Sequence, residues 1–245
     1  MKVSRLAAVL AVMLIPAGPA SAFDTTEIKA NGGSVLPSLG VTIDVVGDSA
    51  LPTATRSSHA AEIGFIAGRS RHKQELDAGD KPIVFGGQTF SGPQDLHYTA
   101  NIRFADLVYR YRRFFGQSNF AIEGLGGIGW ASLGLKAVGA TQSAAVNLSD
   151  AGLVLGVGGI WRFQPATSLQ LRLTAFGSGS TEGVTSASRF EVYVAHALAR
   201  NLNVRAGLGS VSARSAREDD RDSNSTNSPI RASASGVLLG LDFVF

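Results

Sequence analysis

Histidines are the side chains best suited to catalysis in this chain. A histidine with a serine two residues further on would suit hydrolysis of a lipid ester or amide, because the imidazole can act as the base for a hydroxyl nucleophile. Leu198 stands two residues after His196, and Thr99 stands two residues after His97, so neither shows this spacing. The four histidines are His59, His72, His97 and His196. We expect them to lie at interfaces or at the edge of a lumen, and we assign no catalytic residue and no enzymatic activity.

Two other patterns suggest chemistry but have simpler explanations. Asp219, Asp220 and Asp222 lie in a polar stretch, where a solvated run of charge is the expected state. Gly124–Gly129 has a GxGGxG spacing, but it lies within a strand pattern and not at a turn from a strand into a helix, so it is not a nucleotide loop. The chain has no cysteine, which excludes thiolate metal sites. We therefore expect no cofactor and no metal.

The first residues have the form of a signal peptide. Lys2 and Arg5 are followed by an apolar run at 6–15, and Ala20-Ser21-Ala22 has the small-x-small form that signal peptidase cleaves. The apolar run has about half the ~20 residues that a membrane-spanning helix needs. We expect residues 1–22 to be removed and the mature chain to be exported.

The mature chain, residues 23–245, is expected to form one domain. Among the 245 residues, 44% are hydrophobic, 29 are glycine and only 17% are charged. This composition excludes a largely disordered chain and leaves enough apolar material for one sizeable fold. Without Lys2 and Arg5 the chain carries 20 basic and 19 acidic residues, a net charge of +1, so it has no electrostatic basis for binding nucleic acid.

From about residue 34 onward the hydrophobic pattern has a period of two, as in β-strands. In the last segment the large apolar residues are Val237, Leu239, Leu241, Phe243 and Phe245. The residues between them include Gly236, Gly240 and Asp242, which are small or polar. Similar alternation recurs at 41–46, 61–69, 97–114, 119–136, 150–163, 168–176, 189–199 and 202–212. Many of these segments are long for globular strands and suit strands that cross a bilayer.

The connections between these segments alternate in length. Short connections are expected at 116–118, 165–167 and 200–201, and long polar ones at 70–96, 137–149, 177–188 and 215–231. This alternation is typical of an all-β, antiparallel up-and-down transmembrane β-barrel with tight turns at one end. Strand parity favours ten strands, with a tenth at Thr25–Ala30. The alternative is eight strands, with 23–56 as a periplasmic extension, so 57–245 is the most secure part of the barrel.

The segment 97–114 does not keep its phase. Its outward apolar set begins on even numbers at Tyr98 and ends on odd numbers at Tyr111. We therefore predict a β-bulge near Ala105-Asp106, since a bulge adds one residue without turning the apolar face inward.

The face opposite the apolar residues carries isolated charges, which are predicted to point into the lumen. A turn at 116–118 would place Arg110 opposite Glu123, and Arg205 and Asp242 lie at similar depth on neighbouring strands. Further inward charges are predicted at Arg103, Arg112, Arg162, Arg172 and Glu191, and at Asp44 if the segment 41–46 is a strand of the barrel. A lumen of eight to ten strands is nearly filled by side chains, so paired charges that plug it are favoured over a solute channel.

Aromatic residues gather near the short-turn end, as in the girdles of membrane barrels. They are Tyr109, Tyr111, Phe114, Phe115, Phe120, Trp161, Phe163, Phe243 and Phe245. In a water-soluble barrel these outward residues would form an exposed apolar belt, which argues against a lipocalin-like fold.

The terminal Phe245, preceded by Phe243 and Leu241 at every second position, resembles the C-terminal assembly signal of bacterial outer-membrane barrels. The segments Tyr109–Phe114 and Glu123–Trp130 also resemble a hairpin of the small opacity/attachment-type (OmpX- or OmpW-like) porin-family barrels. The resemblance covers most of 57–245. It implies a Gram-negative outer membrane, contact with its lipid and recognition by the barrel-assembly machinery through the last strand.

Fold alone does not decide function in these families. The favoured hypothesis is a non-enzymatic surface protein whose loops at 70–96 and 215–231 bind an external partner or stabilise the envelope. The alternatives are a lipid-modifying barrel enzyme and a narrow small-solute channel.

Overall fold

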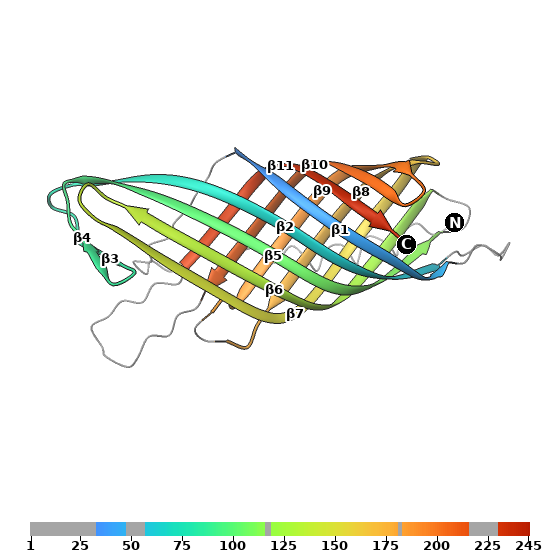
Figure 1. The fold of residues 1–245 in the computed structure, drawn as a ribbon, viewed down its shortest axis with the longest axis horizontal. Coiled ribbons are helices and arrows are strands. Elements are labelled where there is room, and N and C mark those ends of the chain that lie inside the picture. Colours follow the sequence, from blue (N-terminus) through green and yellow to red (C-terminus); the bar gives the residue numbers. More distant parts are fainter. Residues whose placement is uncertain (1–32, 48–56, 116–118, 181–182, 216–229) are drawn as a thin grey trace, which may run out of the picture.

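The computed structural model describes residues 33–47, 57–115, 119–180, 183–215 and 230–245. These residues form strands and no helix (Figure 1). The strands are β1 (Gly33–Gly47), β2 (Ser57–Leu76), β3 (Ile83–Phe85), β4 (Gln88–Phe90), β5 (Gln94–Phe114), β6 (Phe120–Val138), β7 (Ser143–Gln164), β8 (Thr167–Gly177), β9 (Ser186–Ala199), β10 (Leu202–Ser215) and β11 (Ile230–Val244). No helix in the described ranges is long and apolar enough to cross a membrane.

Within the described residues, nine strands close into a barrel in the order β1-β11-β10-β9-β8-β7-β6-β5-β2. All neighbouring pairs are antiparallel except β1 and β11, which run parallel from Gly33↔Ser235 to Thr42↔Val244. The all-β up-and-down barrel is therefore confirmed, but both predicted strand counts are wrong for the described part. The parity argument failed because it required every neighbouring pair to be antiparallel. The proposed tenth strand at 25–30 lies outside the described residues.

The two ends of the barrel differ. At the short-turn end, β7 connects to β8 through Pro165 and Ala166, and β9 connects to β10 through Arg200 and Asn201, as predicted. The predicted turn at 116–118 lies outside the described residues, as do most of 215–231. At the other end, called here the long-loop end, the expected loops at 70–96 and 137–149 are largely strand. β2 continues to Leu76, the β3–β4 hairpin follows, and only residues 139–142 separate β6 from β7.

The four longest strands project beyond the rest of the barrel at the long-loop end (Figure 1). β2, β5, β6 and β7 have 19 to 22 residues, whereas the other barrel strands have 11 to 15. In this projecting sheet, residues 67–76 of β2 pair only with β5, and residues 143–152 of β7 pair only with β6. The inner side of the sheet is covered in part by the β3–β4 hairpin, which buries Phe85 and Phe90 in the same apolar cluster as Tyr98.

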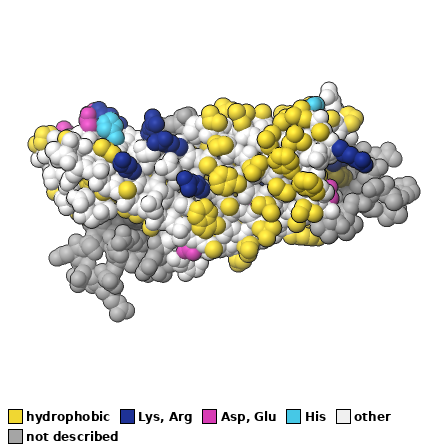
Figure 2. Space-filling model, viewed as in Figure 1, with side chains coloured by type: hydrophobic (Ala, Val, Ile, Leu, Met, Phe, Trp, Pro, Cys, Tyr) yellow, Lys and Arg dark blue, Asp and Glu magenta, His cyan; other side chains and the backbone are white. Residues whose placement is uncertain are grey.

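Large apolar side chains point outward from every barrel strand in the half nearer the short-turn end. Figure 2 shows this apolar belt covering one half of the visible face, beside a half that is mainly polar. Many of these residues are between 38% and 70% exposed, which is high for large apolar residues. One member from each strand is Val35, Ile63, Leu107, Ile128, Leu155, Leu171, Phe190, Leu208 and Leu239. At the C-terminal end of the chain the belt extends over nine successive residues, from Val237 on β11 to Phe245, which directly follows the strand.

Between the belt and the long-loop end, the apolar and polar residues exchange the inner and outer faces of the barrel. On β5 the even residues point inward without interruption, from Leu96 to Phe114. Near the short-turn end this inner face carries Asp106 and Arg110, whereas near the long-loop end it carries Tyr98 and Phe104. The outer face changes in the opposite sense, from the belt to polar and charged residues.

The β-bulge predicted at Ala105-Asp106 is therefore wrong. The register of β5 with both β2 and β6 runs through this site without a shift. The apolar residues at Tyr98 to Phe104 face the interior, and Arg103, predicted to be inward, is exposed on the outside. The strand keeps one phase, and only the environment on its two sides changes.

Candidate functional site

Charged side chains converge in the lumen at the level of the belt. Arg172, on β8, lies at the centre of this lumen network. Its Nη1 is 3.0 Å from Glu62 Oε2, and its Nε is 2.9 Å from Glu123 Oε1. Only 7% of the Arg172 side chain and 10% or less of either carboxylate side chain is exposed. One guanidinium thus bridges two buried carboxylates from β2 and β6, the two strands that pair with β5.

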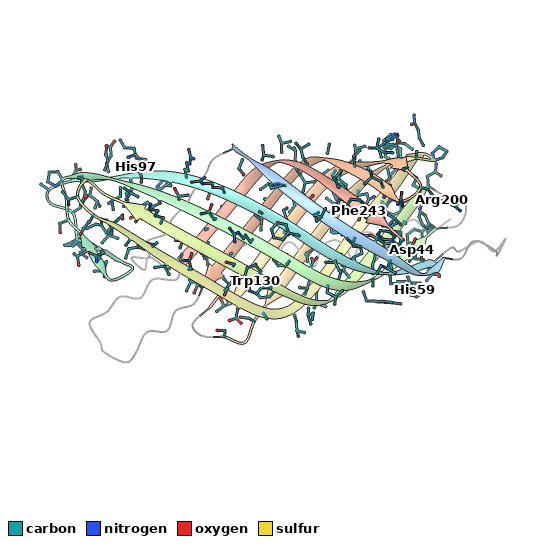
Figure 3. All side chains as sticks on the ribbon, viewed as in Figure 1. Asp44, His59, His97, Trp130, Arg200 and Phe243 are labelled. Atoms are coloured by element: carbon teal, nitrogen blue, oxygen red, sulfur yellow. The ribbon has the colours of Figure 1, made fainter. Side chains whose placement is uncertain are left out.

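Each of these carboxylates has a second arginine. Arg110 on β5 pairs with Glu62 through Nη1 and lies 3.4 Å from Asp44 Oδ1 through Nη2. Arg112 Nη2 lies 3.1 Å from Glu123 Oε2. Asp44 is 46% exposed, so the network reaches solvent on that side. In Figure 3, Asp44 lies near the same end of the barrel as Arg200 and His59, and His97 lies near the other end.

A second group lies next to this network. Arg189 on β9 has Nη2 3.0 Å from Asp106 Oδ2 and Nε 3.2 Å from Glu191 Oε2. Its guanidinium also lies 5.4 Å from the centre of the Phe104 ring, where the apolar interior begins. Because a buried charge is costly unless an opposite charge lies beside it, these ion pairs explain how a narrow barrel holds so many ions.

The predicted pairing of Arg110 with Glu123 is wrong by two residues. Glu123 stands opposite Arg112, and Arg110 stands opposite Leu125. Two is the side-chain period of a strand, so both residues still point into the lumen. The error arose because β5 ends at Phe114 and β6 begins at Phe120, so the connection between them is longer than the three residues assumed.

The predicted pairing of Arg205 with Asp242 is also wrong by two residues. Asp242 stands opposite Asn203, and Arg205 stands opposite Gly240. Asp242 accepts a hydrogen bond from Thr42 Oγ1 at 3.2 Å, and Arg205 donates to the Leu241 carbonyl at 3.4 Å. The Arg205 guanidinium also lies 5.6 Å from the centre of the Tyr193 ring. Both charges line one cavity, but the predicted direct pair is not the contact that either of them makes.

The cavity has a volume of about 230 Å³, enough for several water molecules. Its walls include Glu62, Asp106, Arg172, Arg205 and Asp242. In the long-loop half of the barrel, the interior of the described part is apolar. There the interior is filled by side chains that are at most 2% exposed, including Ile66, Ile102, Phe104 and Leu238.

Glycines on the lumen face make room for the network. A Cβ atom on Gly158 of β7 would lie 2.6 Å from Glu123 Oε1 and 2.7 Å from the Leu171 carbonyl oxygen. Such distances are shorter than real side-chain contacts, so glycine at this position is required by close approach. The segment Gly124–Gly129 lies within β6, as the sequence predicted.

The histidines are not assembled into a catalytic group within the described residues. His196 Nδ1 lies 2.8 Å from Thr167 Oγ1, and no described carboxylate is within ion-pair distance of it. His59 contacts Tyr109 on the outer surface. No group of three or more potential metal ligands occurs in the described part of the chain. The acidic run at 219–222 lies outside it.

Sequence reasoning missed the most connected carboxylate, Glu62, because the segment 61–69 was among the weaker strand patterns. It also missed the role of Asp106, which was assigned to a bulge. The unbroken alternation of inward positions on β5 is the signal that could have found Asp106, since it places the carboxylate on the same face as Arg110.

The C-terminal residues lie where the sequence placed them. Leu241 and Phe245 are exposed in the belt, and the Phe245 amide donates to the Thr42 carbonyl at 2.9 Å. The chain matches no protein-family model, and no curated protein and no solved structure is significantly similar to it. The resemblance to opacity/attachment-type barrels and the assembly signal therefore stay predictions.

Proposed function

We propose that this chain is an outer-membrane β-barrel without a catalytic site, anchored by its apolar belt and acting through its long-loop end on an external partner. The belt is the observation that carries the proposal. Strands that cross a bilayer need about 9–11 residues, and the belt has this height on β11. In water the same surface would be an aggregation hazard.

Closure of the barrel supports the same proposal. A strand edge exposed to lipid would leave backbone N–H and C=O groups without partners, at a cost of several kcal/mol each. Here the parallel pairing of β1 with β11 removes the edge throughout the belt. The leader-like segment at 1–22 supports export.

The filled interior favours a barrel that does not conduct solutes, and it argues against a channel. Paired charges occupy the lumen at belt level, and apolar side chains such as Phe104 and Leu238 fill it above. We expect no discrete conductance when the purified chain is inserted into planar bilayers, and stepwise conductance would overturn this part of the proposal.

The projecting sheet is the proposed binding surface for the external partner. Residues 67–76 and 143–152 extend above the belt with polar outer faces, so in the proposed orientation they stand in water beyond the lipid. A rigid sheet positions side chains better than a loop does. We therefore place partner binding on the segment 70–96, which includes the β3–β4 hairpin.

The two tryptophans provide the test, since they stand at opposite edges of the belt. Trp130 lies on the outer face where β6 leaves the belt, and Trp161 lies near the short-turn end of β7. The single-tryptophan variants W130F and W161F are reconstituted into vesicles that contain lipids with spin labels at different depths. We expect each remaining tryptophan to be quenched more strongly by a shallow label than by a deep one. Absence of quenching by any lipid-borne label would refute insertion.

Cell fractionation tests the proposed location in the outer membrane. Expressed with residues 1–22 in a Gram-negative host, the chain is expected in the outer-membrane fraction, and recovery of folded monomer in detergent-free buffer would contradict the proposal.

A further inference from the structure

A cluster of cations lies on the outer face of the barrel directly above the belt. It consists of Arg69 and Arg71 on β2, Arg103 on β5 and Lys136 on β6, and we call it the basic patch. All four side chains are exposed. Figure 2 shows cationic side chains beside the boundary of the apolar belt.

The strand register brings these four residues together. Arg71 is opposite Thr99, and Thr99 is opposite Lys136, so these three residues form one row across β2, β5 and β6. Arg69 is opposite Asn101 in the row below, and Arg103 follows Asn101 on the same face of β5. Neighbouring strands lie about 4.8 Å apart, so the four cations surround the polar side chains of Thr99 and Asn101.

The basic patch has no counter-charge of its own. None of its four side chains has an ion-pair partner in the ranges that the structure describes. The nearest acids on this face, Glu75 and Asp95, both pair with Lys73 at 3.0 Å. These hydrogen bonds, first the one to Asp95, raise the pKa of the Lys73 ammonium, so both acids are engaged by this lysine and not by the basic patch. Like charges at neighbouring strand positions repel one another unless an anion lies between them.

We propose that the basic patch binds the phosphate of a lipid headgroup, and in particular a phosphomonoester, at the long-loop end of the belt. This inference rests on the proposed insertion into a membrane. The position of the patch favours a lipid over a protein, because Phe65 and Trp130 of the belt lie immediately below it. A phosphomonoester carries up to two negative charges and several acceptor oxygens, which suits four cations better than a singly charged diester does. Thr99 and Asn101 supply further hydrogen-bond donors at the centre.

The test uses the full chain in a neutral detergent, titrated with short-chain phosphatidic acid while binding is followed by native mass spectrometry. Phosphatidylglycerol with the same acyl chains tests the preference for the monoester, and inorganic phosphate tests the need for a lipid. The variant R69Q/R103Q removes two charges from the patch. The control R113Q/R200Q removes two exposed charges near the short-turn end.

At about 1 kcal/mol for each cation near a lipid surface, we expect R69Q/R103Q to bind phosphatidic acid roughly 30-fold more weakly than the parent chain. The control should retain at least half of the parent affinity, and binding to the parent should weaken as salt is raised. Equal weakening in both variants, equal binding of the two phospholipids, or competition by millimolar inorganic phosphate alone would overturn the inference. Quenching of tryptophan by spin-labelled lipid is measured in parallel, on the same protein preparations reconstituted into vesicles. Loss of that signal would indicate a failure of the proposed function, whereas intact insertion without phosphate selectivity would refute only the basic patch.

Discussion

Removal of the Arg172 guanidinium is expected to destabilise the barrel more than any exposed charge does. In R172M the side chain keeps most of its length but loses both contacts, at 3.0 Å to Glu62 and at 2.9 Å to Glu123. Breaking a buried ion pair by removing one member costs 3–5 kcal/mol in typical proteins, because the other charge stays buried. Glu62 keeps Arg110 and Glu123 keeps Arg112, so we expect the lower end of this range, about 3 kcal/mol.

The free energy of unfolding is measured by urea titration of the chain in lipid vesicles, with tryptophan fluorescence as the readout. With a urea dependence of about 1–3 kcal/mol per molar, the loss corresponds to a midpoint that falls by roughly 1–3 M. R113M is the matched control, because it removes an arginine that is exposed on the outer face of β5, near the short-turn end. Its effect should stay within about 0.5 kcal/mol.

A double variant separates the network from general loss of packing. If R172M is destabilised because Glu62 is left with one partner fewer, then E62Q/R172M should be more stable than the sum of the two single effects by about 0.5–3 kcal/mol. Equal stability of R172M and R113M, or strict additivity with E62Q, would show that the lumen network does not hold the strands together.

Two further pairs of variants test the belt and the lumen glycines. L155R places a cation in the belt and should make insertion less favourable by about 2–4 kcal/mol, whereas N147R, on the outer face of the same strand outside the belt, should change it by less than about 1 kcal/mol. Folding into vesicles measures both effects, and effects of similar size would contradict the position of the belt. G158A brings a Cβ atom against Glu123 and should cost about 1–3 kcal/mol in the urea titration, whereas G124A, whose Cβ would meet nothing within 4 Å, should change stability by less than about 0.5 kcal/mol; a G124A variant as unstable as G158A would show that the lumen is not what limits residue size.

Period-two alternation was sufficient to predict the class of fold and most strands. In β8 and in the part of β11 that begins at Val237, most large apolar residues lie on one face and most small or polar ones on the other, since these residues lie within the belt. The short turns after Gln164 and Ala199 were likewise evident from their polar residues. Side-chain facing was correct for Arg110, Glu123, Arg205 and Asp242, because a register error of two residues does not change the face.

The contacts that these inward charges make were not predictable from the alternation. Which inward charge meets which depends on register, on barrel shear and on strands distant in sequence, and none of these is encoded in the local pattern. Arg172 contacts Glu62 across 110 positions of the chain. The strand count failed for a related reason, because the pairing of β1 with β11 joins the two ends of the described chain.

The error on β5 has the most instructive physical cause. Sequence reasoning assumed that the apolar face of a strand has one neighbour, lipid, along its whole length. A strand of 21 residues is about twice as long as a bilayer requires, so in the proposed membrane orientation one part faces hydrocarbon and the other part faces water. In the first part the stable arrangement is apolar outside and paired charges inside, and in the second part it is apolar inside and polar outside. A single backbone phase satisfies both, since only the residue types exchange faces, between Phe104 and Leu107. In a strand longer than about 12 residues, an exchange of apolar residues from even to odd positions therefore indicates the edge of the belt as readily as it indicates a bulge. If the proposed insertion holds, the outward cations that begin at Arg103 stand at the level of the lipid headgroups.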